Sequence, residues 1–311
     1  MRFAVMIEGQ EDVGWEDWLA IARTCERLGF EALFRSDHYG SVEGVEARGS
    51  LDAWSTVCAL AAVTTELRLG TLVSPATFRH PSVLAKSAVT ADHISGGRVE
   101  LGLGTGWNER EHAAYGFPFP SMKVRMDRLA EQLEIVTRSW AEGPFSFSGE
   151  HYAVDRLDAR PKPVQSPLPL VMGGAAAPRG AGLAARYAAE YNVVHATPDE
   201  ARAARERLAS ACRDAGRDPA TLTFSLMHAI LIGADEDDLR ARVDRYAEWS
   251  GEQFDLAERR RAWLGGTPDE VIARLREYEA AGVERVMLQH LLHTDHAALE
   301  LFAAEIAPAF A

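Results

Sequence analysis

Short apolar runs alternate with amphipathic helical stretches along almost the whole of this 311-residue chain. Apolar and polar residues do not alternate regularly within the runs, which is typical of strands covered on both faces and therefore of a parallel sheet. We predict eight strands, at residues 3–7, 30–34, 67–73, 99–103, 170–172, 191–194, 222–232 and 285–289. A helical pattern follows every strand, at residues 15–28, 52–64, 81–94, 108–115 with 125–141, 174–189, 198–215, 235–263 with 268–281, and up to about 306.

Eight consecutive strand–helix units favour an α/β fold with a TIM-like (β/α)8 barrel over the alternative, an open doubly wound sheet. A barrel with insertions fits the length of the chain, so we expect a single domain over residues 1–311. Alternating apolar residues (Phe145, Phe147, Tyr152 and Val154) predict a hairpin within an insertion at about residues 144–169. Residues 235–266 are expected to form a variable helical region.

The charge balance and the cysteines exclude some classes of protein. The net charge of −13 argues against nucleic acid and anionic membranes as partners, because both attract basic surfaces. Cys25, Cys58 and Cys212 lack metal-ligand spacing and indicate free thiols in a reducing compartment. The apolar run before Glu8 is too short for a signal peptide or a membrane span. We therefore expect a cytoplasmic protein.

The carboxyl ends of the strands hold the active site of a barrel, so the residues there are the candidates. Asp37 and His38 follow the second predicted strand. A histidine can give or take a proton near neutral pH, although it can also simply cap a turn. Ser74 and Pro75 follow the third strand, where composition alone favours a plain turn.

Glycine-rich segments follow the next two strands. They are Gly104-Thr105-Gly106-Trp107-Asn108 after the fourth strand and Gly173-Gly174-Ala175 after the fifth. Amides at a helix N-terminus can bind a phosphate, although a tight strand-to-helix turn requires the same glycines. Two glycine-rich segments at the same end of the barrel favour a single elongated, phosphorylated cofactor that contacts both.

The histidines near the last strands do not predict a metal site. His195 ends the sixth strand, and His290, His293 and His296 follow the eighth at a spacing of three. This spacing wraps the side chains around a helix start instead of bringing them to one point. We expect no metal, which disfavours a metal-dependent barrel hydrolase.

Six motifs occur in an order that resembles the luciferase-like monooxygenase superfamily, specifically its deazaflavin (coenzyme F420)-dependent oxidoreductases. They are FRSDHY (Phe34–Tyr39), GTLVSP (Gly70–Pro75), FRHP (Phe78–Pro81), HISGGR (His93–Arg98), GLGTGW (Gly102–Trp107) and PKP (Pro161–Pro163). The resemblance covers about residues 1–290.

The resemblance implies a barrel of the bacterial luciferase type with a flavin or deazaflavin lying across the carboxyl ends. It implies a non-proline cis peptide at Leu72–Val73, next to Ser74, behind the ring. It places Asp37 and His38 near the reacting face. The implied contacts to the rest of the cofactor are Gly104, Thr105, Gly106 and Trp107 along the tail, and Gly173, Gly174 and Ala175 at the phosphate. A homodimer is also implied.

Two departures from the family pattern bear on the substrate. Relatives often carry a third glycine where Ala175 stands, and the sugar-phosphate dehydrogenases carry a glutamate where Trp107 stands. A sugar-phosphate substrate is therefore not expected here, nor is a general acid at position 107.

The resulting hypothesis is an oxidoreductase that moves a hydride between reduced coenzyme F420 and a small organic substrate. His38 would exchange the proton, Trp107 and Phe78 would wall the pocket, and Arg79 would hold an anionic group. The alternatives are an FMN-dependent monooxygenase that uses oxygen and a non-catalytic flavin-binding barrel.

Overall fold

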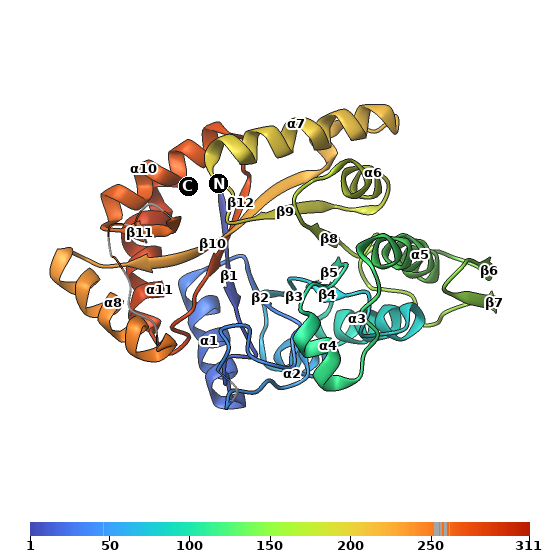
Figure 1. Ribbon diagram of the computed structural model, residues 1–311, viewed down its shortest axis with the longest axis horizontal. Helices are drawn as coiled ribbons and strands as arrows, with labels where there is room; N and C mark the ends of the chain where they lie inside the picture. Colours follow the sequence, from blue (N-terminus) through green and yellow to red (C-terminus); the bar gives the residue numbers. More distant parts are fainter. Residues whose placement is uncertain (46, 252–254, 256, 258–259, 261) are drawn as a thin grey trace.

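The computed structural model describes residues 1–45, 47–251, 255, 257, 260 and 262–311. Among these residues, eight parallel strands close into a barrel that helices surround (Figure 1). The barrel strands are β1 (Arg2–Ile7), β2 (Ala32–Arg35), β3 (Arg68–Thr71), β5 (Val99–Gly104), β8 (Leu170–Gly173), β9 (Glu190–Val194), β10 (Thr223–Ile232) and β12 (Arg285–Gln289). Because β10 pairs with both β9 and β12, the ring is closed, which confirms the barrel and excludes the open sheet.

The surrounding helices begin and end at recognisable capping residues. Asp52 and Thr197 accept a backbone N–H at the starts of α2 and α7, and left-handed Gly29 and Gly96 end α1 and α3. The helices are α1 (Trp15–Leu28), α2 (Ala53–Val63), α3 (Pro81–Ser95), α4 (Glu109–Tyr115), α5 (Met122–Trp140), α6 (Pro178–Tyr187), α7 (Pro198–Asp214), α8 (Glu236–Ser250), α10 (Pro268–Ala280) and α11 (His296–Leu301). Of the helices described, none combines the length and the apolar character needed to cross a bilayer.

The third predicted strand is interrupted. β3 ends at Thr71, the Leu72–Val73 peptide bond is cis, and the short β4 (Ser74–Pro75) then pairs with β5. The cis bond confirms what the family resemblance implies. The prediction of one continuous strand over residues 67–73 is wrong. An apolar run does not reveal where the backbone changes direction.

Two inserted regions were predicted with different success. β6 (Phe145–Ser148) and β7 (Ala153–Leu157) form the expected antiparallel hairpin, which projects beyond α5 in Figure 1. In the region expected to be helical at 235–266, α8 agrees, but β11 (Leu264–Gly266) is a strand that pairs with the end of β10. Residues 252–254, 256, 258, 259 and 261 of that region lie outside the described residues.

The two ends of the barrel interior differ in composition. At the amino ends of the strands, the guanidinium of Arg285 lies 2.8 Å from Glu100 and 3.1 Å from Glu190, and its side chain is 1% exposed. Above it lies an apolar layer that includes Phe34 and Met287. This packing fills the lower part of the barrel, so an interior cavity forms at the carboxyl ends.

Candidate functional site

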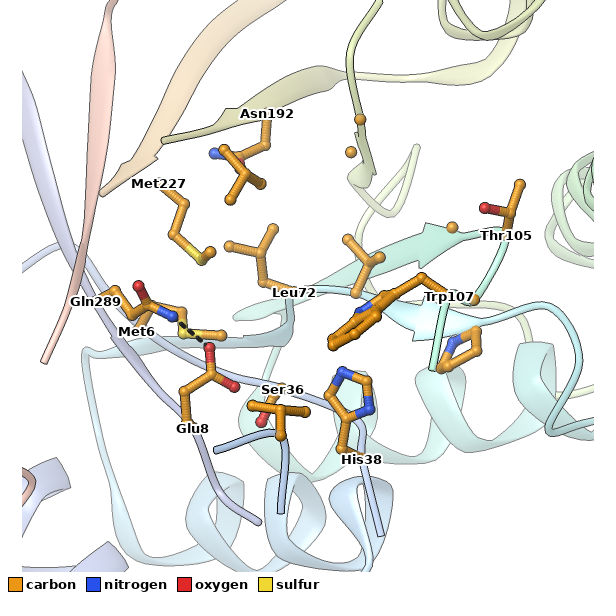
Figure 2. Close-up of a pocket in the computed structure, with 18 of the residues that line it drawn as sticks. Met6, Glu8, Ser36, His38, Leu72, Thr105, Trp107, Asn192, Met227 and Gln289 are labelled. Atoms are coloured by element: carbon orange, nitrogen blue, oxygen red, sulfur yellow. Dashed lines mark hydrogen bonds between the residues drawn. The ribbon is translucent and has the colours of Figure 1, made fainter. Parts of the chain in front are cut away.

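A cavity of about 450 Å³ opens at the carboxyl ends of the strands (Figure 2). Its size is within the range of small-molecule and cofactor sites. Most of the predicted site residues line it: His38, Leu72, Val73, Gly104, Thr105, Gly106, Trp107, Gly173 and Gly174. Three predicted residues, Asp37, Ser74 and Ala175, are not among the residues that line it.

The Val73 side chain lies on a surface made by glycines. A Cβ atom at Gly104 would come within 2.6 Å of Val73 Cγ2, and one at Gly102 would come within 1.9 Å of the Thr71 carbonyl oxygen. A Cβ atom added at Gly173 would have its nearest neighbour 3.6 Å away. Gly102 and Gly104 therefore allow the strands and Val73 to pack closely, whereas Gly173 leaves space on the cavity side.

The loop between β8 and α6 is fixed by bonds within the chain. The Gly174 N–H donates to the Asn192 carbonyl at 3.1 Å, and the Ala176 N–H donates to the Tyr191 hydroxyl at 3.0 Å. Arg207 donates to the carbonyl oxygen of Ala175 at 3.1 Å. The N-cap of α6, Ala177, makes no side-chain capping bond. The start of α6 therefore retains amide donors that suit an anionic group.

His38 forms the wall of the cavity next to Trp107. The two rings meet edge to face with their centroids 5.5 Å apart, and Trp107 is 62% exposed at the mouth (Figure 2). His38 Nδ1 lies 2.8 Å from Glu111 Oε2, and the Glu111 side chain is 1% exposed. Glu111 Oε1 accepts the backbone N–H groups of Tyr39 and, at 3.2 Å, of Gly40. The carboxylate therefore fixes both the His38 ring and the backbone after it.

The pair changes the proton affinity of both residues. Burial alone would lower the pKa of His38, but the hydrogen bond and charge of Glu111, with Glu8 and Asp37, raise it above 6.5. Burial would raise the pKa of Glu111, but its bonds to His38 and to the two backbone amides lower it below 4.5. The raised pKa of His38 and the lowered pKa of Glu111 both favour a charged imidazolium–carboxylate pair.

Asp37 and Arg79 bind each other behind the cavity wall. Asp37 Oδ2 accepts from Arg79 at 2.5 Å and from the Ser74 hydroxyl at 2.6 Å, and Arg79 also pairs with Asp52 at 2.9 Å. Arg79 is therefore not placed to hold an anionic ligand in the cavity, contrary to the sequence hypothesis. Phe78 likewise packs against Tyr39 and Phe117 instead of lining the pocket.

A polar region faces the cavity from the other side. Glu8, directly after β1, accepts from the Gln289 amide at 2.6 Å (Figure 2). Its other carboxylate oxygen accepts from the Gln10 amide at 2.8 Å. His195 lies nearby, and burial lowers its pKa while the charge of Glu8 opposes that change. Sequence reasoning missed Glu8 and Glu111. The position of Glu8 at a strand end was a usable signal, but nothing in the sequence separated Glu111 from other helix glutamates.

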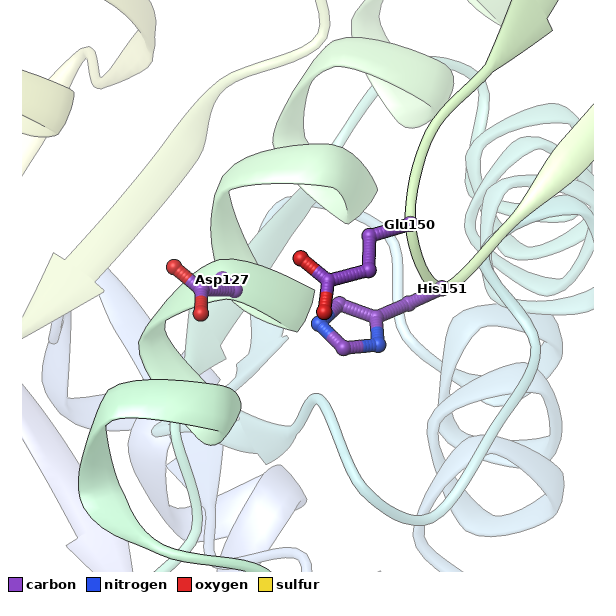
Figure 3. Close-up of side chains that lie close together, drawn as sticks. All are labelled: Asp127, Glu150 and His151. Carbon is purple, nitrogen blue, oxygen red and sulfur yellow. The ribbon is translucent and has the colours of Figure 1, made fainter.

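One cluster of potential metal ligands lies outside the cavity. Asp127 on α5 lies close to Glu150 and His151 at the tip of the hairpin (Figure 3). Asp127 already forms ion pairs with Lys123, at 3.0 Å, and with Arg179. Because two cations neutralise this carboxylate, the cluster does not require a metal ion. His290, His293 and His296 do not form such a cluster within the described part of the chain.

The cavity has features that fit a flavin-type cofactor. An apolar surface at Leu72 and Val73 suits a flat ring system, and the glycine-lined end at Gly173 leads to the start of α6. The Gly106 backbone, in a left-handed conformation with φ of 76°, turns the chain along the same wall. This donor set suits an elongated molecule with a ring at one end and a phosphate at the other.

Comparisons with known proteins agree with this geometry. The family model for luciferase-like monooxygenases matches residues 1–285. Pyrimidine monooxygenase RutA of Stutzerimonas stutzeri (strain A1501) is 31% identical over 70% of this chain and 58% of RutA. F420-dependent hydroxymycolic acid dehydrogenase of Mycobacterium tuberculosis (strain ATCC 25618 / H37Rv) is 29% identical over 82% of this chain and 70% of that protein.

A solved structure shares the whole fold. An F420-dependent secondary alcohol dehydrogenase, solved in complex with an F420–acetone adduct, has a TM-score of 0.82 over 100% of this chain and 99% of that chain, at 20% identity. The match spans less than two thirds of the length of RutA. The match of the family model to nearly the whole length shows that this chain belongs to the luciferase-like monooxygenase family.

Proposed function

We propose that this protein is an oxidoreductase that transfers a hydride between reduced coenzyme F420 and a small organic acceptor. The observation that carries the proposal is the placement of His38, whose Nδ1 is held by Glu111 while the ring stands in the cavity. Transfer of a hydride to an organic acceptor needs a nearby group that exchanges a proton. The F420-dependent mycobacterial relative, which aligns with 82% of the chain, supports the choice of cofactor.

We assign the following roles to the residues that line or support the cavity. Bound reduced F420 would supply the hydride. Leu72 and Val73 would support its ring, the start of α6 would bind its phosphate, and Ala175 remains a proposed contact there. Met6 and Met227 line the cavity with apolar side chains, which would reduce the number of water molecules around the acceptor. Asp37 would act indirectly, through its bonds to Ser74 and Arg79.

A second candidate is an FMN-dependent monooxygenase that uses oxygen, which the similarity to RutA favours. Titration of the purified apoprotein with F420 and with FMN separates the two, because quenching of Trp107 fluorescence reports on occupancy of the cavity. The W107F variant is the matched control, since it keeps an aromatic wall and removes the reporter. We expect F420 to bind at lower concentration than FMN.

Each other outcome of the titration has a defined meaning. Preferential FMN binding, followed by oxygen consumption with reduced FMN, would replace the F420 proposal with the monooxygenase. Binding of either cofactor without oxidation of its reduced form by any acceptor in a broad screen would favour the non-catalytic barrel. The homodimer remains a separate proposal, which light scattering of the purified protein tests.

A further inference from the structure

Glu111 is a buried carboxylate whose negative charge is balanced by a histidine. Within the described residues, its ion-pair partner is His38, at 2.8 Å, and no arginine or lysine pairs with it. Its other oxygen is occupied by the backbone N–H groups of Tyr39 and Gly40. The N-cap Asn108 binds the Glu111 backbone N–H at 3.3 Å, which fixes where the side chain leaves α4. A buried carboxylate held in this way is stabilised when its partner carries a positive charge.

The Nδ1 atom of His38 must carry a hydrogen to donate to Glu111. The Nε2 atom binds no described residue and is not buried, and the ring projects into the cavity beside Trp107 (Figure 2). Three carboxylates act on the His38 ring: Glu111 from α4, Glu8 directly after β1, and Asp37 next to it, of which Asp37 is neutralised by Arg79. The unbalanced charge around His38 is therefore negative.

We propose that Glu111 is a positioning residue that keeps His38 protonated on both ring nitrogens, with Nδ1–H on its carboxylate and Nε2–H directed into the cavity, so that the enzyme works as a reductase of its acceptor. The direction of the reaction rests on the proposed function, whereas the protonation state of His38 does not. The raised pKa of His38 supports the geometry.

The proton and electrons balance in the reduction of a carbonyl acceptor. Bound reduced F420 would supply the hydride for the new C–H bond and would itself be oxidised, while the π electrons of the C=O bond would move to oxygen. The Nε2–H bond of His38 then breaks, and its proton forms the O–H bond of the alcohol. The neutral imidazole, still bound to Glu111 through Nδ1–H, regains a proton from water at the exposed mouth.

The test is a titration of His38 in the apoprotein, so that it does not depend on a cofactor or a substrate. The protein is labelled with ¹⁵N at the histidine rings, and the His38 signals are assigned by their loss in H38Q. We expect a midpoint above 6.5 in the wild type and below 6.5 in E111Q, because burial then dominates. E8Q, which removes an equal charge that does not touch His38, is the matched control and should lower the midpoint less.

A chemical probe gives a second readout. Diethyl pyrocarbonate modifies neutral imidazole, so His38 should react more slowly in the wild type than in E111Q near pH 7, as followed by peptide mass mapping. A wild-type midpoint at or below 6.5, or equal midpoints and equal reactivities in the two proteins, would overturn the proposal. If E111Q does not fold, the wild-type midpoint alone decides. Failure of F420 to bind would refute the proposed function but leave the His38–Glu111 result intact.

Discussion

At the scale of single residues, the glycines around Val73 have different tolerances for a side chain. An alanine at Gly102 would place its Cβ atom 1.9 Å from a backbone oxygen, which cannot move without disrupting β3. An alanine at Gly173 would make contacts of 3.6 Å or more and occupy the cavity side. We expect G102A to lose about 3 kcal/mol or more of unfolding free energy and G173A to lose less than about 0.5 kcal/mol.

Urea unfolding measures both values, and cofactor titration completes the comparison. G173A should weaken cofactor binding while the protein stays folded, because its added methyl group lies on the cavity side. Equal stability of the two variants would contradict the assignment of close packing to Gly102.

Arg79 has a structural role in place of the ligand-binding role expected from the sequence. Its partner Asp37 is 1% exposed, and Asp37 Oδ1 has no partner in the described structure. R79A would leave this carboxylate buried and uncompensated, which costs about 3–5 kcal/mol. The control R202A removes an exposed pair with Asp199 and should cost less than about 1 kcal/mol. Chemical denaturation compares the two. A stable R79A with weakened binding of anionic ligands would restore the original hypothesis.

At the scale of elements, a carboxylate on α5 binds several backbone N–H groups at the tip of the β6–β7 hairpin. Glu131 accepts the backbone N–H groups of Glu150 at 2.7 Å and Tyr152 at 2.9 Å, and a Cβ at Gly149 would lie 2.4 Å from it. We expect E131A to raise amide hydrogen exchange at residues 149–152 several-fold without changing exchange in the barrel strands. D237A, which removes an exposed i,i+3 pair with Arg240 on α8, is the control. Unchanged exchange at the hairpin tip would show that other contacts hold it.

The elements that sequence predicted well are those with a local signal. All eight barrel strands have an apolar run, and helices such as α1 and α3 end at a glycine. The break between β3 and β4 and the strand β11 were missed, because each depends on pairing with a strand distant in sequence. The cis bond came from the family resemblance, since no local pattern marks it.

At the scale of the whole molecule, the site combines residues that the fold alone brings together. The strand-end rule located His38 and the glycines, which follow their strands directly. The rule selected Asp37 and His38 together, although only His38 lines the cavity. Adjacent residues in an extended segment point in opposite directions, so Asp37 points behind the cavity wall. Glu111 reaches His38 from a helix 73 residues later in the chain, so its role is visible only in the folded structure. The sequence therefore predicted where the cavity lies better than it predicted which side chains contact one another there.

Two buried histidines make the stability of the whole molecule sensitive to acid. Burial lowers the pKa of His228 to about 3 and that of His290 to about 4, and each residue is 3% exposed. Between these values and 6.5, the unfolded chain binds protons that the folded chain does not. The stability is therefore full above pH 6.5 and falls as the pH decreases, by about 1 kcal/mol per pH unit for each histidine.

The H228Q/H290Q double variant isolates this contribution from that of the carboxylates. Urea unfolding of both proteins at about pH 7, 6 and 5 should give a steeper loss of unfolding free energy in the wild type than in the variant. The His38–Glu111 pair acts in the opposite sense, since a raised histidine pKa stabilises the fold at low pH and loses that effect as the pH rises through it. Because the pair is present in both proteins, it cancels in the comparison. Parallel pH profiles would show that both histidines accept protons without unfolding.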